Sequence, residues 1–143
     1  MANEIEKMGA KIGAPNGLDT KETQHELTAL DWNIQELLER VEGDRQLLLE
    51  LLGMFHEESH GTMEKANGAL SRGDLNELSR IAHGMKGMMK NLAMGAGAEI
   101  ASVLEKAAAK ESQNDSAVQL AKLEHALTLI LREVEAQMTE LRA

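Results

Sequence analysis

The sequence predicts an all-α protein, an antiparallel up-down four-helix bundle with a short additional helix at its N-terminal end. Of 143 residues, only one is proline, one Trp and one Phe, and none is Tyr, whereas sheets are enriched in aromatic and β-branched residues. The other apolar residues are mainly Leu, Ala, Met and Ile, mixed with Glu, Lys, Gln and Arg. This is the composition of helical proteins. The length fits one domain with a single core.

The chain divides into two parts. Residues 1–28 contain the turn-forming sequence Pro15-Asn16-Gly17 and few regularly spaced apolar residues, so they are predicted to form a loosely ordered N-terminal arm. Residues 29–143 are predicted to form the bundle. No internal repeat or low-complexity tract interrupts this second part.

Two helices are predicted directly after the arm. The first, short helix spans about residues 31–42, with its first residue, an aspartate, as N-cap and Gly43 at its end. The second spans about residues 44–71, with Asp44 as N-cap and Gly73 as the stop. Its apolar residues recur at helical spacing and form one stripe: Leu48, Leu51, Leu52, Phe55, Thr62, Met63, Ala66 and Leu70.

Three further helices are predicted at about residues 74–92, residues 96–112, and from residue 115 to the C-terminus. The connections between the long helices are short, so consecutive helices should be antiparallel neighbours. The last helix carries a second apolar stripe: Leu120, Leu123, Leu127, Ile130, Leu131, Val134, Met138 and Leu141. Four such stripes facing inward predict the core of the bundle.

Charge and composition exclude several classes of function. The formal net charge is -9 and the isoelectric point about 5.0, which disfavours general binding to nucleic acid or to an anionic membrane. Without cysteine, the chain has no disulfide, no thiolate metal site and no cysteine nucleophile, as in many proteins of the reducing cytosol. The longest apolar run, residues 126–131, is far too short to span a bilayer. We therefore expect a soluble, cytoplasmic protein.

The third predicted helix, residues 74–92, contains a histidine in an unusual place. At 100° per residue, its apolar side chains gather on one side of the helix, and His83 falls on the other side, near Arg80, Gly87 and Lys90. A hydrogen-bonded core histidine is therefore a weak explanation. A solvated surface histidine without a role is the stronger alternative to a functional one.

The neighbours of this histidine favour a function. Gly84 and Gly87 lie inside the helix, where each should cost roughly 1 kcal/mol relative to Ala. Gly87 follows one turn after the histidine, so another protein could approach the imidazole closely there. Arg80, Lys86 and Lys90 form a cationic cluster on an acidic protein, which suits an anion beside the imidazole. The alternative explanation of these three cations is a solvated helix face.

An exposed imidazole near its ordinary pKa of about 6.5 is largely neutral at cytoplasmic pH. In that state it is a competent nucleophile toward phosphorus. A phosphoryl group on its nitrogen would present anionic oxygens to the neighbouring lysine. The pattern therefore suits phosphoryl transfer through a histidine.

The sequence HGMKG at residues 83–87 resembles the H-x-[apolar]-K-G core of histidine-containing phosphotransfer (HPt) domains, which relay phosphoryl groups between receiver-domain aspartates. The resemblance extends from about Leu30 to the C-terminus. It implies that His83 is phosphorylated, that Lys86 assists the phosphoryl group and that Gly87 clears the docking surface. It also implies that Glu105, on the next helix, orients the imidazole. From their place beside the histidine, Arg80, Gly84 and Lys90 are expected to contact the partner.

The chain departs from the HPt pattern at three places. Gly84 replaces a small hydroxyl residue, and Met88 and Met89 stand where smaller residues are common. Ala93 occupies a position usually held by glycine in the turn after the histidine helix, so Gly95-Ala96-Gly97 is expected to supply that turn. These departures concern the end of the helix and the interface, not the nucleophile.

The resemblance also predicts partners. They are receiver domains of response regulators and a hybrid sensor histidine kinase, and the receiver supplies Mg²⁺ from its own acidic pocket. We expect no cofactor or metal bound by this chain, and a monomer. Gly95-Ala96-Gly97 follows no predicted strand and lacks the rest of a nucleotide fingerprint, so no ATP-dependent kinase activity is expected.

Two other functions remain open from the residues. A non-catalytic helical adaptor would use the same His83 face for docking. A metalloprotease is suggested by residues 56–60, HEESH, which match the zinc motif H-E-x-x-H. The longer form of that motif fails because Met63 stands where a glycine is needed, and helical spacing directs His60 toward solvent.

Overall fold

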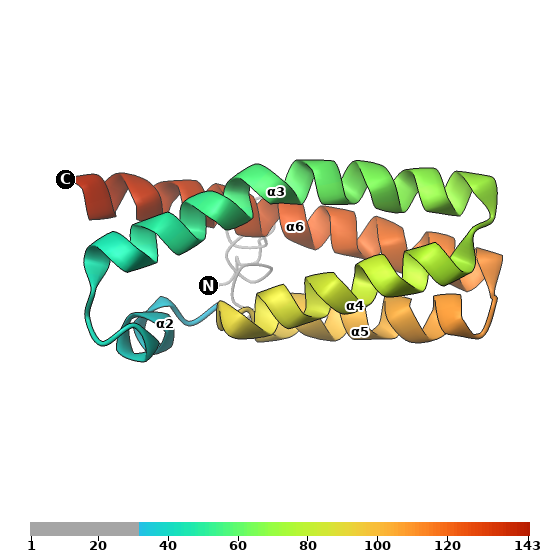
Figure 1. Ribbon diagram of the computed structural model, residues 1–143, viewed down its shortest axis with the longest axis horizontal. Coiled ribbons are helices and arrows are strands. Elements are labelled where there is room, and N and C mark those ends of the chain that lie inside the picture. The colour runs from blue at the N-terminus through green and yellow to red at the C-terminus, as the bar shows by residue number, and fades with distance from the viewer. Residues whose placement is uncertain (1–31) are drawn as a thin grey trace, which may run out of the picture. The chain divides into compact units, whose positions relative to one another are not determined.

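The computed structural model describes residues 32–143, which form five helices. They are α2 (Ile34–Arg40), α3 (Arg45–Arg72), α4 (Leu75–Asn91), α5 (Gly95–Ala109) and α6 (Gln113–Arg142). The four long helices run side by side in alternating directions (Figure 1). Each packs on its two neighbours in the closed order α3, α4, α5, α6. The predicted all-α class is confirmed, whereas the arm predicted for residues 1–28 lies outside the described residues.

The predicted ends of α3 and α4 agree with the structure. The side chain of Asp44 accepts a hydrogen bond from the Leu47 amide at 3.0 Å, and that of Asp74 accepts one from the Glu77 amide at 3.1 Å. Gly73 ends α3 in the left-handed conformation, with φ of 72°. Short polar side chains before a helix and glycine after it thus define these boundaries.

The first short helix starts later than predicted. Its N-cap is Asn33, whose side chain accepts a hydrogen bond from the Glu36 amide at 3.0 Å, so the assignment of Asp31 as the cap is wrong. The helix also ends earlier, at Arg40, because Glu42 and Gly43 both adopt positive φ, 55° and 77°. Asparagine is as good an N-cap as aspartate, so composition alone does not choose between them.

The last helix starts earlier than predicted. Ser112 is the N-cap of α6 and accepts a hydrogen bond from the Asp115 amide at 3.2 Å. The predicted start at Asp115 is therefore wrong, because the helix begins at Gln113. Asp115 lies instead in the first turn, where its negative charge is favourable beside the helix N-terminus.

The turn between α4 and α5 differs from its prediction. Ala93 itself adopts the left-handed conformation, with φ of 61°, and Gly95 and Gly97 lie within α5. The glycine at position 97 has a packing reason. A Cβ atom there would lie 2.9 Å from Met89 Sδ and 3.0 Å from Ile130 Cδ1. Gly97 therefore allows α4 and α6 to approach α5 closely.

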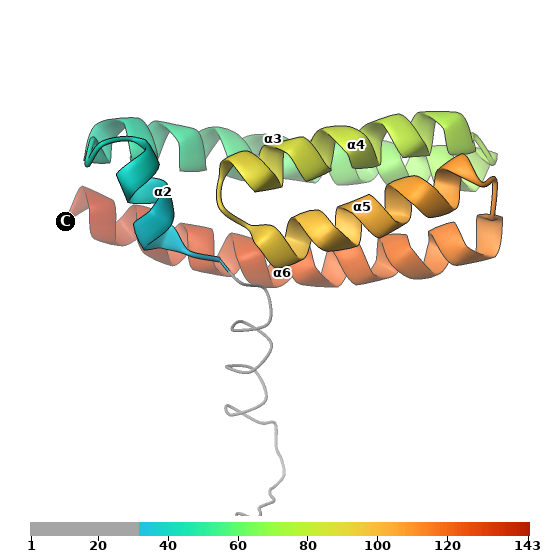
Figure 2. The same ribbon diagram turned by 90° about the horizontal axis from the view of Figure 1, so that it is seen from below.

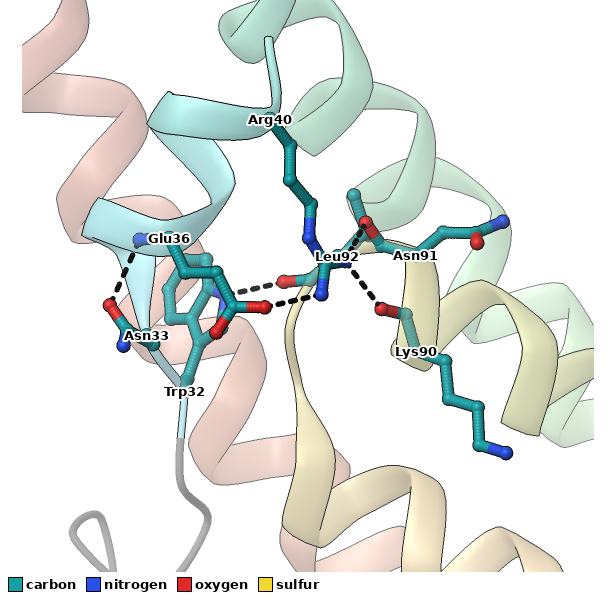
Figure 3. A network of polar contacts seen from close by, with 7 residues as sticks. All are labelled: Trp32, Asn33, Glu36, Arg40, Lys90, Asn91 and Leu92. Atoms are coloured by element: carbon teal, nitrogen blue, oxygen red, sulfur yellow. Dashed lines mark hydrogen bonds and ion pairs between the residues drawn. The ribbon is translucent and has the colours of Figure 1, made fainter.

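Residues at the start of the described chain, Trp32 and Arg40, make hydrogen bonds to the C-terminal end of α4 (Figure 3). Arg40 Nη1 donates hydrogen bonds to the backbone oxygens of Lys90 and Asn91, at 2.8 and 3.1 Å, and Trp32 Nε1 donates to that of Leu92 at 2.9 Å. The last carbonyls of a helix have no partner within it and carry partial negative charge. Arg40 and Trp32 supply these missing partners.

Figure 2 shows α2 beyond the turn between α4 and α5, alongside the N-terminal part of α3. The bundle core is made of Leu, Met, Ala, Ile and Val with the single Phe, and α5 contributes mainly alanines. Among the described residues, no helix is both long and apolar enough to cross a membrane.

Candidate functional site

His83 lies on the solvent side of α4. Leu78, Ala82, Met85 and Met89 of the same helix are buried against the bundle, whereas the His83 side chain is 69% exposed. The structure thus places the histidine where helical spacing predicts it. A partner can reach the ring without any rearrangement of the core.

Glu105, from the C-terminal half of α5, contacts this imidazole. Glu105 Oε2 lies 2.9 Å from His83 Nδ1. Because a carboxylate can only accept hydrogen bonds, Nδ1 carries the proton and donates it. The other ring nitrogen, Nε2, then keeps its lone pair in the neutral ring.

The close packing of α4 and α5 makes this contact possible. Most buried residues of α5 are glycine or alanine, and the Ser79 hydroxyl of α4 donates a hydrogen bond to the Glu105 backbone oxygen at 3.2 Å. Glu105 is therefore held at the level of the histidine by backbone as well as side-chain contacts.

Lys86 completes a three-residue arrangement with His83 and Glu105. Lys86 Nζ lies 2.7 Å from Glu105 Oε1, the carboxylate oxygen that does not contact the histidine. The hydrogen bond from Lys86 is the main cause that lowers the pKa of Glu105 below its ordinary value; burial opposes it, and the hydrogen bond from His83 adds to it. The carboxylate is therefore ionised at neutral pH, as the contact with the Nδ1 proton requires.

The cationic cluster predicted around His83 is partly neutralised. Arg80 pairs with Glu77, at 2.5 Å, and Lys86 pairs with Glu105. Lys90 has no ion pair within the part of the chain that the structure describes. Of the three cations, Lys90 is thus the one whose charge is left for a partner.

Gly84 and Gly87 are open to solvent. A Cβ atom added at either position would find no atom within 4 Å outside its own helix. Packing within the bundle therefore does not require glycine at these two positions, in contrast to Gly97. Both lie beside the histidine, and neither adds a side chain to the surface around it.

The H-E-x-x-H residues of α3 are arranged differently from a zinc site. His56 Nε2 contacts Glu135 Oε2 of α6 at 2.9 Å, and His60, 84% exposed, lies 3.5 Å from Glu64 Oε2 on its own helix. Within residues 32–143, no group of three or more His, Asp or Glu side chains is arranged to hold a metal ion. The protease alternative thus has no support in the described structure.

The fold and this site define a class: a four-helix bundle that presents an exposed histidine on one helix, in contact with a carboxylate of the next. A family model described as the Hpt domain matches residues 50–143, and the chain belongs to this family. Hpt domains take part in histidine phosphotransfer within phosphorelays and interact with receiver domains. Comparisons with curated proteins and with solved structures gave no match.

Sequence reasoning missed several contacts. The pairing of Arg80 with Glu77 has a signal in the sequence, because side chains three residues apart meet on a helix. The pairing of Lys86 with Glu105 joins two helices, and no local spacing predicts it. The hydrogen bonds from Arg40 to the end of α4 span about fifty residues and likewise have no local signal.

Proposed function

We propose that this protein relays a phosphoryl group between receiver-domain aspartates through a phosphohistidine at His83. The observation that carries the proposal is the exposed imidazole whose Nδ1 is bound to Glu105, 2.9 Å away, so that Nε2 is free to attack. In this proposal the exchange takes place in the cytoplasm between a monomer of this protein, response-regulator receivers and a hybrid sensor kinase.

The transfer step needs no proton to move. The Nε2 lone pair of the neutral imidazole forms a bond to phosphorus while the bond from phosphorus to the aspartate oxygen breaks, and its electron pair returns to the aspartate carboxylate. The ring, still protonated at Nδ1, becomes positively charged. The Glu105 carboxylate stabilises that charge, and the reverse step releases a neutral imidazole.

The other proposed roles follow from position. Lys86, one turn from the histidine, stabilises the phosphoryl oxygens, and the receiver supplies Mg²⁺ from its own acidic residues. Gly84 and Gly87 admit the receiver to the ring, because neither has a side chain that would block its approach. Arg80 and Lys90 contribute to docking with an acidic partner.

A transfer assay tests this function. Receiver domains carrying a ³²P-labelled aspartyl phosphate are mixed with the protein, without ATP, and label on the protein is followed with time. We expect label that is lost in acid and stable in base, as for a phosphoramidate, and none on His83→Gln. Binding of the receiver without any label would support the adaptor alternative instead.

A further inference from the structure

The two carboxylate oxygens of Glu105 contact two different residues, and phosphorylation of His83 would affect these two contacts differently. One oxygen contacts His83 Nδ1 at 2.9 Å, and the other contacts Lys86 Nζ at 2.7 Å. The side chains of Lys86 and Glu105 are only 21% and 25% exposed. Their attraction is therefore screened less by water than that of an ordinary surface pair.

A phosphoryl group on His83 would introduce a second anion within reach of the same lysine. Lys86 follows His83 by three residues, which places the two side chains next to each other on one helix face. A phosphoryl group carries close to two negative charges at neutral pH. The lysine ammonium sits on a flexible stem and has three donors, so it can turn from a carboxylate to phosphoryl oxygens.

We propose that Glu105 and the phosphoryl group on His83 compete for Lys86, so that Glu105 sets how far phosphoryl exchange with the receiver proceeds toward phosphohistidine. This inference rests on the proposed function. Glu105 acts here as a positioning residue. It accepts the hydrogen bond from the Nδ1 proton of the imidazole and, in the unphosphorylated state, also binds the Lys86 ammonium. Each transfer to His83 then costs part of the contact between Lys86 and Glu105.

Replacement of Glu105 has two opposite effects on the phosphorylated state. Glu105→Gln keeps an oxygen that accepts the Nδ1 hydrogen bond but removes the charge that stabilises the positive ring, which disfavours phosphohistidine. The same change releases Lys86 for the phosphoryl oxygens, which favours it. The first effect does not involve Lys86, so a double-mutant cycle with Lys86→Gln separates the second from the first.

The experiment measures the equilibrium ratio of phosphorylated protein to phosphorylated receiver for the wild type, Glu105→Gln, Lys86→Gln and the double variant. Glu105→Gln changes this ratio by one factor when Lys86 is present and by another factor in the Lys86→Gln background. We expect the first factor to favour phosphohistidine at least about threefold more than the second, which is the scale of a partly shielded ion pair. Equal displacement in the two backgrounds would overturn the inference. Glu99→Gln, an exposed charge on the same helix, is the matched control and should leave the ratio unchanged.

Two further arms keep the result decisive. Circular dichroism verifies that each variant is folded, and Glu105→Ala, which introduces the best helix former, takes the place of Glu105→Gln if the latter unfolds, with the same coupling expected. Absence of label on the wild-type protein would contradict the proposed function itself. Label on the wild type without coupling between Lys86 and Glu105 would contradict only this inference.

Discussion

Substitution of Gly87 separates access to His83 from the stability of the bundle. Gly87 lies inside α4, and a Cβ atom at this position would meet nothing within 4 Å. Gly87→Gln therefore introduces no clash within the protein. It replaces a helix-breaking residue by a good helix former while it places a side chain of four heavy atoms beyond Cβ beside the imidazole.

The expected gain in stability follows from helix propensity. Glycine is less favourable than alanine by about 0.8–1.0 kcal/mol in a helix interior and glutamine by a few tenths, so the free energy of unfolding should rise by about 0.6 kcal/mol. With an unfolding entropy of about 2.1 cal/mol/K per residue over roughly 110 residues, this corresponds to a rise in Tm of about 2–3 °C. Phosphoryl transfer from a receiver should slow by about tenfold or more, because the new side chain occupies the surface where the partner docks.

Thermal unfolding followed by circular dichroism measures the first effect and the ³²P transfer assay the second. Gly61→Gln is the matched control: Gly61 is also exposed within a long helix, α3, and a Cβ atom there would likewise meet nothing within 4 Å. The control should gain similar stability and transfer at the wild-type rate. A Gly87→Gln protein that is less stable than the wild type, or that transfers normally, would contradict this role of Gly87.

Three other predictions concern packing, acid sensitivity and docking. Gly97→Ala should lower the free energy of unfolding by about 1–2 kcal/mol in a urea titration, because its Cβ would lie 2.9 Å from buried Met89 Sδ; unchanged stability would contradict this. The lowered pKa of Glu105 means that its contribution to stability is present above the ordinary value of 4.5 and lost as the pH falls through the folded value, so Glu105→Gln should lose less stability than the wild type on acidification below pH 4.5; parallel losses would argue against it. Lys90→Ala should lower the transfer rate at low salt more than Arg80→Ala does, because Arg80 is paired within the helix and Lys90 is not; equal effects would contradict the difference.

The helices themselves were predictable because their boundaries rest on local chemistry. Asp44, Gly73 and Asp74 stand directly at helix ends, where their own side chain or their backbone freedom determines the structure. The errors arose where several residues could serve equally well. Asn33 and Ser112 cap helices that aspartates two or three residues away could have capped, and the residue types alone do not distinguish these alternatives.

The turn after α4 shows a different limit of sequence reasoning. The glycines at 95 and 97 suggested the turn, but Ala93 takes the left-handed conformation, although this conformation is unfavourable for a residue with a Cβ atom. The Ala93 backbone oxygen accepts a hydrogen bond from the Asn33 amide at 3.3 Å, a long-range contact that helps to hold the turn. No pattern within the turn itself contains that information.

The residues of the site were predictable from the sequence, but the ion pair between Lys86 and Glu105 was not. Helical spacing alone placed His83 opposite the apolar stripe, and the structure has it exposed. The HPt resemblance supplied Glu105 as the residue beside the ring, and the structure has the two in contact. The ion pair of Glu105 with Lys86 depends on the distance between two helices, which Gly97 and the alanines of α5 determine only once the bundle is folded.

The most direct test of phosphoryl transfer through His83 is the position of the phosphoryl group on the wild-type protein. The chain contains five histidines, and the protein can be labelled with ¹⁵N in their rings and phosphorylated by a phospho-receiver. We expect nuclear magnetic resonance to show one phosphorylated ring, that of His83, with coupling between ³¹P and Nε2 and with Nδ1 still protonated. A phosphoryl group on another histidine, or on Nδ1 of His83, would contradict it.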